Sequence, residues 1–198
     1  MPKSDLEKTA TGKSSQSKGS AFELQVCKRI AQHFNQLGVD GLVFSYGDDI
    51  HRTEGSGNTV HEKGDIIIPH PLLAILFPFI IECKAVEGWT LEQIVRYDNE
   101  DNKEDWFFVE EWMMLQKQVS RDRKPIVIFK RDRSETFVLF NRQNVYIDLQ
   151  GKENRFYIQF AVSNEYMAVM TLNGFLDAVA PYVRVQNVVN NFRKLQEV

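Results

Sequence analysis

The sequence predicts an α/β domain in which a mixed β-sheet carries helices on its faces. Three observations lead to this prediction. Large apolar residues near the N-terminus recur with helical spacing, several short β-branched runs bounded by Gly and Pro follow, and a second helical pattern precedes further β-rich runs. This order of helix, strands, helix and strand is typical of a sheet covered by helices.

The composition excludes several classes of protein. Of the 198 residues, 43% are hydrophobic and 26% are charged, and the net charge of −3 is ordinary for a globular domain. Two cysteines are too few for a disulfide framework or a multi-cysteine zinc site, so we expect free thiols in a reducing cytosol. The N-terminus has no signal-peptide pattern, and the longest apolar run, Leu72 to Ile81, is half of a membrane span. We therefore expect a cytoplasmic protein without a membrane partner.

The N-terminal part of the chain predicts a tail followed by one long helix. Residues 1–18 are mostly polar, so we expect a mobile tail that cannot bury enough surface to offset its ordering entropy. The helix would begin at Ser20 and end before Gly38, because apolar residues recur every four positions between them: Phe22, Val26, Ile30 and Phe34. Ser20 to Glu23 also has the pattern of a capping box, which would give Glu23 a purely structural role.

The central part of the chain predicts strands and then a helix. Apolar runs predict strands at residues 42–46, 66–68 and 75–84, with a polar loop at 47–63 and a turn at 69–71 between them. Pro78 inside the third run indicates an edge position or a bulge, because proline cannot donate a ladder hydrogen bond. The acidic residues 87–104 give no clear pattern. A helix is then expected from Asp105 to Arg123, ended by Pro125.

The remaining residues predict more strands and a terminal helix. Residues 126–129 and 136–140 are expected to form strands, and short β-like runs recur at 145–149, 156–160 and 167–170. A helix is expected within residues 173–196. The chain would thus consist of the tail at residues 1–18, a core at residues 19–142 and an extension at residues 143–198 that packs on the core.

The strongest candidate for a catalytic site consists of Asp65, Glu82 and Lys84. Asp65 opens one predicted strand, and Glu82 and Lys84 lie two residues apart in the next, where the alternation of a strand turns both to one face. Two carboxylates from adjacent strands offer the hard oxygen ligands that Mg²⁺ or Mn²⁺ prefers. A lysine beside them could orient a water or neutralise charge on a phosphate. The structural alternative is a surface carboxylate beside an ordinary Glu–Lys pair.

Charge is distributed unevenly along the chain. Residues 87–111 hold nine acids against two bases, whereas residues 117–133 hold seven bases against two acids. Such a basic stretch can bind a polyanion even when the net charge is negative, although a solvated helix face is the alternative. Arg52, in a glycine-containing loop, is a further candidate for phosphate contact. The candidates in the basic stretch are Arg121, Arg123, Lys130 and Arg131.

Two groups of residues carry a resemblance to known nucleases. Gly64-Asp65, a gap of sixteen residues and then Glu82-Cys83-Lys84 is similar to the signature of the PD-(D/E)XK nuclease superfamily, with Gly64 in place of the signature proline. Two upstream segments, Lys18 to Glu23 and Arg52 to Gly57, resemble the archaeal-type Holliday junction resolvases within that superfamily. The resemblance covers residues 18–133 and implies a restriction-endonuclease-like core with a mixed central sheet.

The resemblance also implies a set of site residues around Mg²⁺, with Mn²⁺ able to substitute. Lys84 would position or activate the attacking water, and Ser56 would lie close to the scissile phosphate. The metal ligands it implies are Glu23, Asp65, Glu82 and the backbone carbonyl of Cys83.

The function implied by the resemblance is a structure-selective DNA endonuclease of recombination and repair. Such an enzyme is a homodimer that cuts two symmetry-related strands of a four-way junction, here in the cytoplasm of a prokaryotic, archaeal or phage-infected cell. One alternative is another nuclease of the superfamily, restriction-like or an exonuclease. The other is a DNA-binding or scaffold protein that keeps the fold without catalysis, which the intact Asp65, Glu82 and Lys84 disfavour.

Overall fold

The protein is described by a computed structural model that covers residues 5–38, 42–53, 64–95, 107–118, 123–131, 133–145, 157–162, 165–180 and 182–196. Within these residues, seven strands form one mixed sheet in the order β1-β2-β3-β4-β5-β7-β6. β3 and β4 pair in parallel, and the other neighbours are antiparallel. The mixed α/β sheet predicted from the sequence is confirmed. Its strands are β1 (His51–Arg52), β2 (Ile66–Ile67), β3 (Phe79–Ala85), β4 (Lys124–Lys130), β5 (Phe137–Asn141), β6 (Tyr157–Val162) and β7 (Glu165–Thr171).

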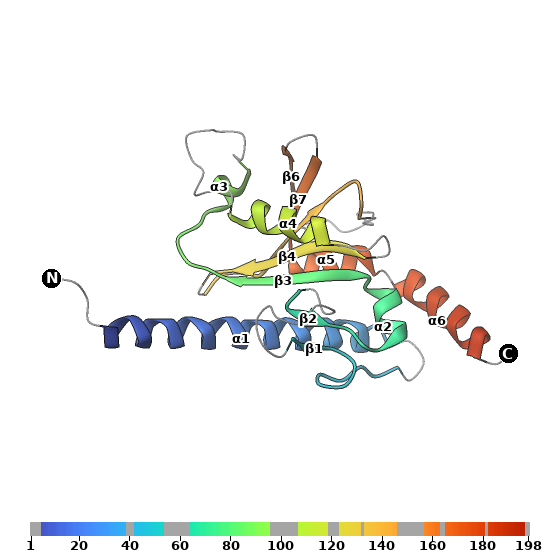
Figure 1. The fold of residues 1–198 in the computed structure, drawn as a ribbon. Coiled ribbons are helices and arrows are strands. Elements are labelled where there is room, and N and C mark those ends of the chain that lie inside the picture. Colours follow the sequence, from blue (N-terminus) through green and yellow to red (C-terminus); the bar gives the residue numbers. More distant parts are fainter. Residues whose placement is uncertain are drawn as a thin grey trace.

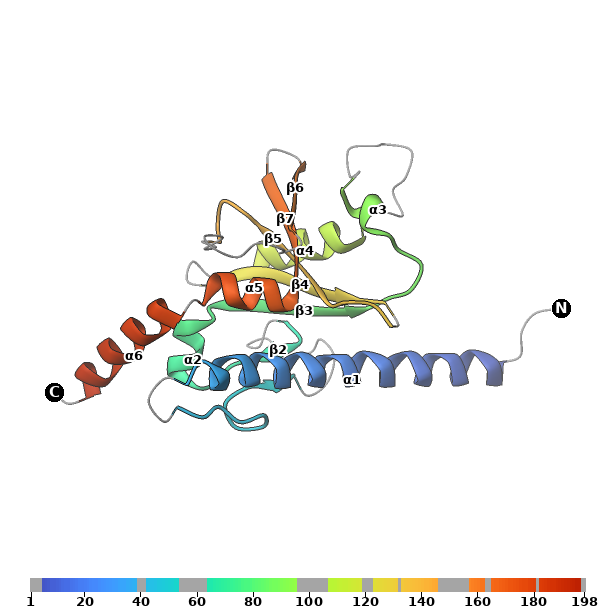
Figure 2. The same cartoon turned by 180° about the vertical axis from the view of Figure 1, so that it is seen from behind.

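Helices cover both faces of this sheet (Figure 1). α1 (Asp5–Gln36), α2 (Pro71–Leu76), α5 (Leu172–Val179) and α6 (Tyr182–Gln196) contribute to the apolar cluster on one face. α3 (Leu91–Val95) and α4 (Phe107–Gln118) contribute to the cluster on the other. The first part of α1 and the end of α6 project from opposite ends of the molecule (Figure 2). Among the described helices, none is long and apolar enough to cross a membrane.

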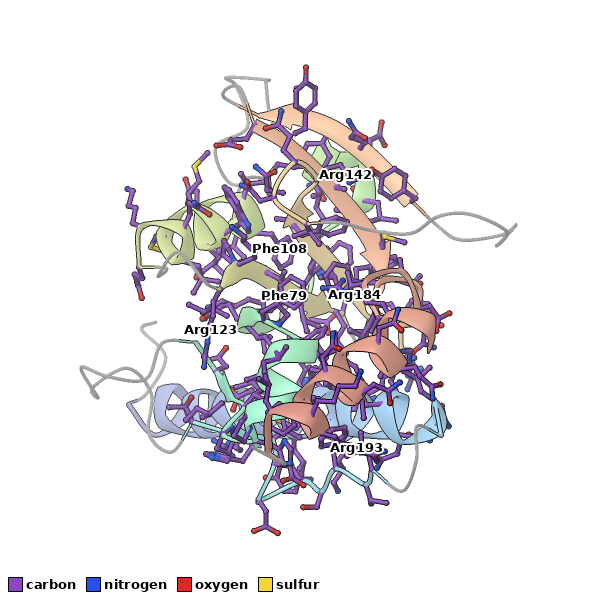
Figure 3. All side chains as sticks on the ribbon, turned by 90° about the vertical axis from the view of Figure 1, so that its right-hand side faces the viewer. Phe79, Phe108, Arg123, Arg142, Arg184 and Arg193 are labelled. Carbon is purple, nitrogen blue, oxygen red and sulfur yellow. The ribbon has the colours of Figure 1, made fainter. Side chains whose placement is uncertain are left out.

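The alternation of side chains along each strand separates the two apolar clusters. On β4, Ile128 faces the cluster of α1 and Phe129 faces the cluster of α4, and both are fully buried. Figure 3 labels Phe79 and Phe108, which belong to the first and the second cluster. The same alternation on β3 decides which side chains of that strand turn toward α4.

The first helix begins at Asp5, much earlier than the start at Ser20 that the sequence predicted. The predicted start of the helix at Ser20 is therefore wrong. Helical hydrogen bonds are local, so a helix nucleated by packing from Phe22 onward can extend into polar residues at one hydrogen bond per residue. Because Ser20 lies inside the helix, it is not an N-cap, and the capping box proposed for Glu23 does not form.

Residues 42–46 do not form the predicted strand. The amide of Asn35 on α1 takes both backbone groups of Phe44: its Nδ2 donates to the Phe44 carbonyl (2.9 Å) and its Oδ1 accepts from the Phe44 N–H (2.7 Å). A backbone that is satisfied by a side chain does not need a strand partner. Only an isolated bridge between Tyr46 and Ile50 resembles sheet pairing in this stretch.

The run predicted as one strand at residues 75–84 contains the end of a helix and then a strand. α2 starts at the predicted turn, where Pro71 is the first helical residue and the His70 side chain accepts from the backbone N–H of Leu73 (3.4 Å). β3 begins at Phe79, so Pro78 precedes the strand and needs no ladder hydrogen bond. β3 lies between β2 and β4, and the predicted edge position or bulge at Pro78 is wrong. Short apolar runs fit buried helices and buried strands equally well.

The second half of the chain follows the prediction more closely. α4 lies within the predicted helix at residues 105–123, and β4 and β5 overlap the two predicted strands. Pro125 is part of β4 and does not mark the end of α4, which ends at Gln118. β6 and β7 add two strands to the same sheet, and two helices, α5 and α6, follow where one was expected. Most of the run predicted at residues 145–149 lies outside the described residues.

Candidate active site

Asp65 lies directly before β2 and is tied to both neighbouring strands. Its backbone N–H donates to the Ile81 carbonyl (2.8 Å), and its carboxylate Oδ2 accepts from the Cys83 N–H (2.7 Å), both on β3. On the other side, the N–H of Thr53 donates to the Asp65 carbonyl (2.9 Å). Burial raises the pKa of Asp65, the Cys83 hydrogen bond opposes this, and the charge of Glu23 raises the pKa further.

Gly64 allows Asp65 to approach β3 so closely. Its φ of 87° lies in the left-handed region, and a Cβ at this position would lie 2.7 Å from the Ile81 carbonyl oxygen. That oxygen also accepts the hydrogen bond from the Asp65 N–H. Proline holds φ near −65°, so it cannot adopt this conformation. The structure thereby explains why glycine stands where the nuclease signature has proline.

Glu82 and Lys84 point to the α4 face of the sheet, as their spacing predicted. The Lys84 ammonium lies 2.8 Å from Glu82 Oε1, and the two side chains are 22% and 18% exposed. Burial raises the pKa of Glu82, and the nearby charge of Asp65 raises it further. Burial alone would lower the pKa of Lys84, but the hydrogen bond to Glu82 and the charges of Glu82 and Glu111 outweigh it, so the pKa lies above its usual value. The carboxyl groups of Asp65 and Glu82 therefore lie close enough to repel each other.

Glu111 is a further member of this cluster that the sequence analysis did not single out. It lies on α4, is 16% exposed, and its Oε1 is 3.2 Å from the Lys84 ammonium. In the sequence it was only one of the nine acids at residues 87–111, and no role was predicted for it. Its contact with Lys84 depends on how α4 lies across β3, and no spacing along the chain could have indicated it.

Glu23 and Arg52 are paired with each other. Arg52 Nε lies 3.2 Å from Glu23 Oε2, and the two side chains are 37% and 18% exposed. Glu23 is on α1, which packs on the face of the sheet opposite α4, yet its charge still raises the pKa of Asp65. Glu23 and Arg52, one residue from each upstream segment of the resemblance, therefore pair with each other, and Glu23 lies close enough to Asp65 to affect its pKa.

Cys83 contributes its backbone and not its thiol. The thiol is buried, burial raises its pKa well above the usual value, and it is a free cysteine packed in the core, as expected. The N–H and C=O of one strand residue point to the same edge of the strand. Because the Cys83 N–H bonds to Asp65, its carbonyl also faces the Asp65 side of β3.

Comparison with known proteins identifies the family. A family model described as "Phage putative PDDEXK endonuclease" matches residues 14–184, which include every residue of the candidate site. The chain belongs to this family. No curated protein and no solved structure matches the chain. Membership in the PDDEXK endonuclease family supports a nuclease that acts on DNA, in agreement with the resemblance seen in the sequence.

Two of the predicted DNA contacts of this PDDEXK family member lie at the site end of β4. Lys130 donates to Gln25 Oε1 on α1 (2.9 Å), and Arg131 donates to the Trp89 carbonyl (3.3 Å). Both follow Phe129, the residue that pairs with Lys84 across the parallel strands. These hydrogen bonds fix Lys130 to α1 and Arg131 to Trp89, at the end of β4 that pairs with Lys84.

Arg123 is a predicted DNA contact that the structure does not bring to the site. Arg123 is exposed at the start of β4, about 20 Å along the strand from the partner of Lys84 at about 3.3 Å per residue. Figure 3 views the molecule from this end of the sheet and labels Arg123 there. Ser56 and Arg121 lie outside the described residues.

The oxygen ligands in this site fit a divalent cation, which PD-(D/E)XK nucleases generally use. Over the described ranges, no group of three or more His, Cys, Asp or Glu side chains could hold a metal ion by itself. Asp65 and Glu82 nevertheless offer two carboxylates whose repulsion a cation would relieve. Mg²⁺ needs no more than one or two carboxylates, because waters and substrate phosphates complete its coordination.

Proposed function

We propose that this protein is a Mg²⁺-dependent endonuclease that hydrolyses phosphodiester bonds of DNA at Asp65, Glu82 and Lys84. The observation that carries this proposal is the half-buried cluster beside β3, where the carboxyl groups of Asp65 and Glu82 repel each other and the Lys84 ammonium lies 2.8 Å from Glu82. Buried charges that repel each other cost stability, and such arrangements gather at functional sites. Mn²⁺ would substitute for Mg²⁺, since both prefer hard oxygen ligands.

Each residue of the proposed site has a distinct task. Asp65 and Glu82 would hold the cation, together with the Cys83 carbonyl that faces the same edge of β3. A bound divalent cation supplies a Lewis acid for the phosphate and lowers the pKa of a bound water. Lys84 carries three N–H donors, of which Glu82 and Glu111 accept two, so one is left for a water or a phosphate oxygen.

Glu23 and Ser56 take the roles that the resemblance implies. Glu23 would complete the metal ligands only after leaving its ion pair with Arg52, which could then contact a phosphate. Ser56 keeps the role that the resemblance implies, close to the scissile phosphate. Lys130 and Arg131 would contact the DNA backbone beside the site, Arg123 would do so farther away, and Arg121 keeps its predicted role as a phosphate contact.

We further propose that the substrate is a branched DNA, a four-way junction cut by a homodimer. One residue from each resolvase-like segment supports this substrate, because Glu23 and Arg52 pair with each other and Glu23 acts on the pKa of Asp65. A junction resolvase nicks two symmetry-related strands, and a two-fold symmetric dimer presents two equal sites to them. Restriction-like and exonuclease activities are the alternatives within the same superfamily.

Glu82→Ala separates an enzyme from a DNA-binding protein that has lost catalysis. We expect cleavage to disappear while DNA binding persists, because the substitution removes a metal ligand and leaves the basic residues in place. Glu110→Ala, at an exposed position of α4, is the matched control and should cleave like the wild type. Cleavage by Glu82→Ala at the wild-type rate would falsify the site assignment.

The symmetry of cleavage tests the proposed substrate. On a labelled four-way junction, we expect paired nicks in opposed strands and a dimer by analytical ultracentrifugation. A strictly monomeric enzyme, or one that cuts linear duplex as fast as the junction, would refute the junction assignment. Metal-dependent cleavage of duplex ends alone would instead point to an exonuclease at the same site.

A further inference from the structure

The carboxylate of Glu111 reaches the site from a different element than the residues of the proposed mechanism. Glu82 and Lys84 lie on β3, whereas Glu111 lies on α4, which packs across the face toward which they point. Its Oε1 is 3.2 Å from the Lys84 ammonium, and its side chain is 16% exposed. Its neighbour Glu110 is exposed, so of these two adjacent acids on α4 only Glu111 faces the site.

The position of Glu111 is fixed by its neighbour on α4. Trp112 is buried, and its Nε1–H donates to the backbone carbonyl of Pro125 on β4 (3.0 Å). This hydrogen bond sets the rotation and height of α4 over the sheet one residue away from Glu111. The Glu111 carboxylate therefore contacts Lys84 from a helix, α4, that a hydrogen bond attaches to β4.

The Lys84 ammonium needs a second carboxylate to hold it in place. A lysine side chain has a flexible four-carbon stem, and Glu82 is the one other carboxylate within ion-pair distance of its ammonium among the described residues. In the proposed reaction, Glu82 also has to hold a cation, which draws its carboxylate away from Lys84. The Phe107 ring, 5.7 Å from the ammonium, adds an attraction but no directional hydrogen bond.

We propose that Glu111 is a positioning residue that holds the Lys84 ammonium in place while Glu82 holds the cation. This inference rests on the proposed nuclease function and deepens it. The metal ligands proposed above do not include Glu111, and the contact that the structure gives its carboxylate is with the Lys84 ammonium. It acts on the reaction through Lys84, which it contacts from a different element than Glu82 does.

The first test compares Glu111→Gln with Glu110→Gln, which makes the same change of charge at the adjacent exposed position. The protein is the full chain, the substrate is saturating labelled DNA with Mg²⁺, and DNA affinity is measured with Ca²⁺ in place of Mg²⁺. We expect Glu111→Gln to lower the single-turnover rate about 10- to 100-fold with unchanged DNA affinity, because a misplaced catalytic group costs rate and not binding. Glu110→Gln should match the wild type.

The second test needs neither metal nor activity. Urea unfolding midpoints are measured in EDTA for the wild type, Glu111→Gln, Lys84→Met and the double variant. If Glu111 holds Lys84, the two substitutions are coupled: Glu111→Gln lowers the midpoint of the wild type, and it has no such effect once Lys84 is Met. Equal effects in both backgrounds would refute the contact.

The outcomes separate this inference from the proposed function. A Glu111→Gln enzyme that cleaves at the wild-type rate overturns the positioning role and leaves the nuclease intact. A Glu111→Gln enzyme that needs much more Mg²⁺ for half-maximal rate also overturns it, because Glu111 would then be a metal ligand. A wild-type protein that cleaves no DNA, although the unfolding midpoints are coupled, refutes the nuclease function and with it the role of Glu111 in the reaction.

Discussion

Gly64→Ala should uncouple Asp65 from β3, and its cost can be worked out from the structure. The substitution imposes two penalties. A non-glycine residue at φ 87° costs about 1–2 kcal/mol, as in other left-handed conformations. The new Cβ would also lie 2.7 Å from the Ile81 carbonyl oxygen, and forcing atoms into a packed site costs about 1–3 kcal/mol. Together they predict a loss of about 2–5 kcal/mol in the free energy of unfolding.

Gly88→Ala is the matched control for this prediction. Gly88 has a φ of 82°, yet a Cβ there would meet no atom within 4 Å, so this variant has the backbone strain without the clash. We expect it to lose about 1–2 kcal/mol and to keep full activity. Gly64→Ala should also lose cleavage, because the clash pushes away the carbonyl that holds the Asp65 N–H and so moves its carboxylate.

Urea unfolding and a single-turnover cleavage assay check both variants. The difference between them isolates the clash with Ile81, since their φ values are nearly equal. If Gly64→Ala is no less stable than Gly88→Ala and cleaves DNA equally well, the close approach of Gly64 to β3 does not position Asp65, and the reasoning is refuted.

Three further predictions concern the fold that supports the site. Trp112→Phe leaves the buried Pro125 carbonyl without its donor and should lower the free energy of unfolding by about 1–3 kcal/mol, measured by urea titration. Asn35→Ala removes both hydrogen bonds to the Phe44 backbone and should speed amide hydrogen exchange at residues 42–46, whereas a protected Phe44 N–H in that variant would contradict the assignment. Burial raises the pKa of Cys27 to about 12, so the native thiol should resist iodoacetamide at pH 8. The folded state keeps this proton longer than the unfolded state, so stability should fall between about pH 9 and 12, and less so in Cys27→Ala.

The sequence was most informative where local pattern and burial agree. The strands after Asp65 and through Glu82 were predictable, because short β-branched apolar runs favour buried strands. Glu82 and Lys84 share a face simply because strand side chains alternate. These regularities need no knowledge of distant parts of the chain.

The errors arise where tertiary contacts override local pattern. Asn35 satisfies the backbone of Phe44 from another element, so a good strand sequence stays unpaired. The apolar run before Pro78 is equally compatible with a short helix, and its histidine cap at His70 is not a common N-cap residue. Each of these features depends on a partner that the local sequence does not reveal.

The same limit applies to the site. Glu111 could not be distinguished from the other acids around it, because its contact with Lys84 depends on the register of α4 over the sheet. Arg123 was expected near the site from its place in a basic stretch, but β4 carries it to the far end of the strand. Proximity along the chain was a poor guide once a seven-residue strand intervened.

Metal-dependent cleavage by the wild type and by Lys84→Ala is the most direct test of the central claim. Both proteins are incubated with a labelled four-way junction, a linear duplex and a single strand, with Mg²⁺, Mn²⁺ or EDTA. We predict that the wild type cleaves with either metal and not in EDTA, and that Lys84→Ala does not cleave. Equal cleavage by both proteins, or no cleavage of any substrate with either metal, would contradict a nuclease site at Asp65, Glu82 and Lys84.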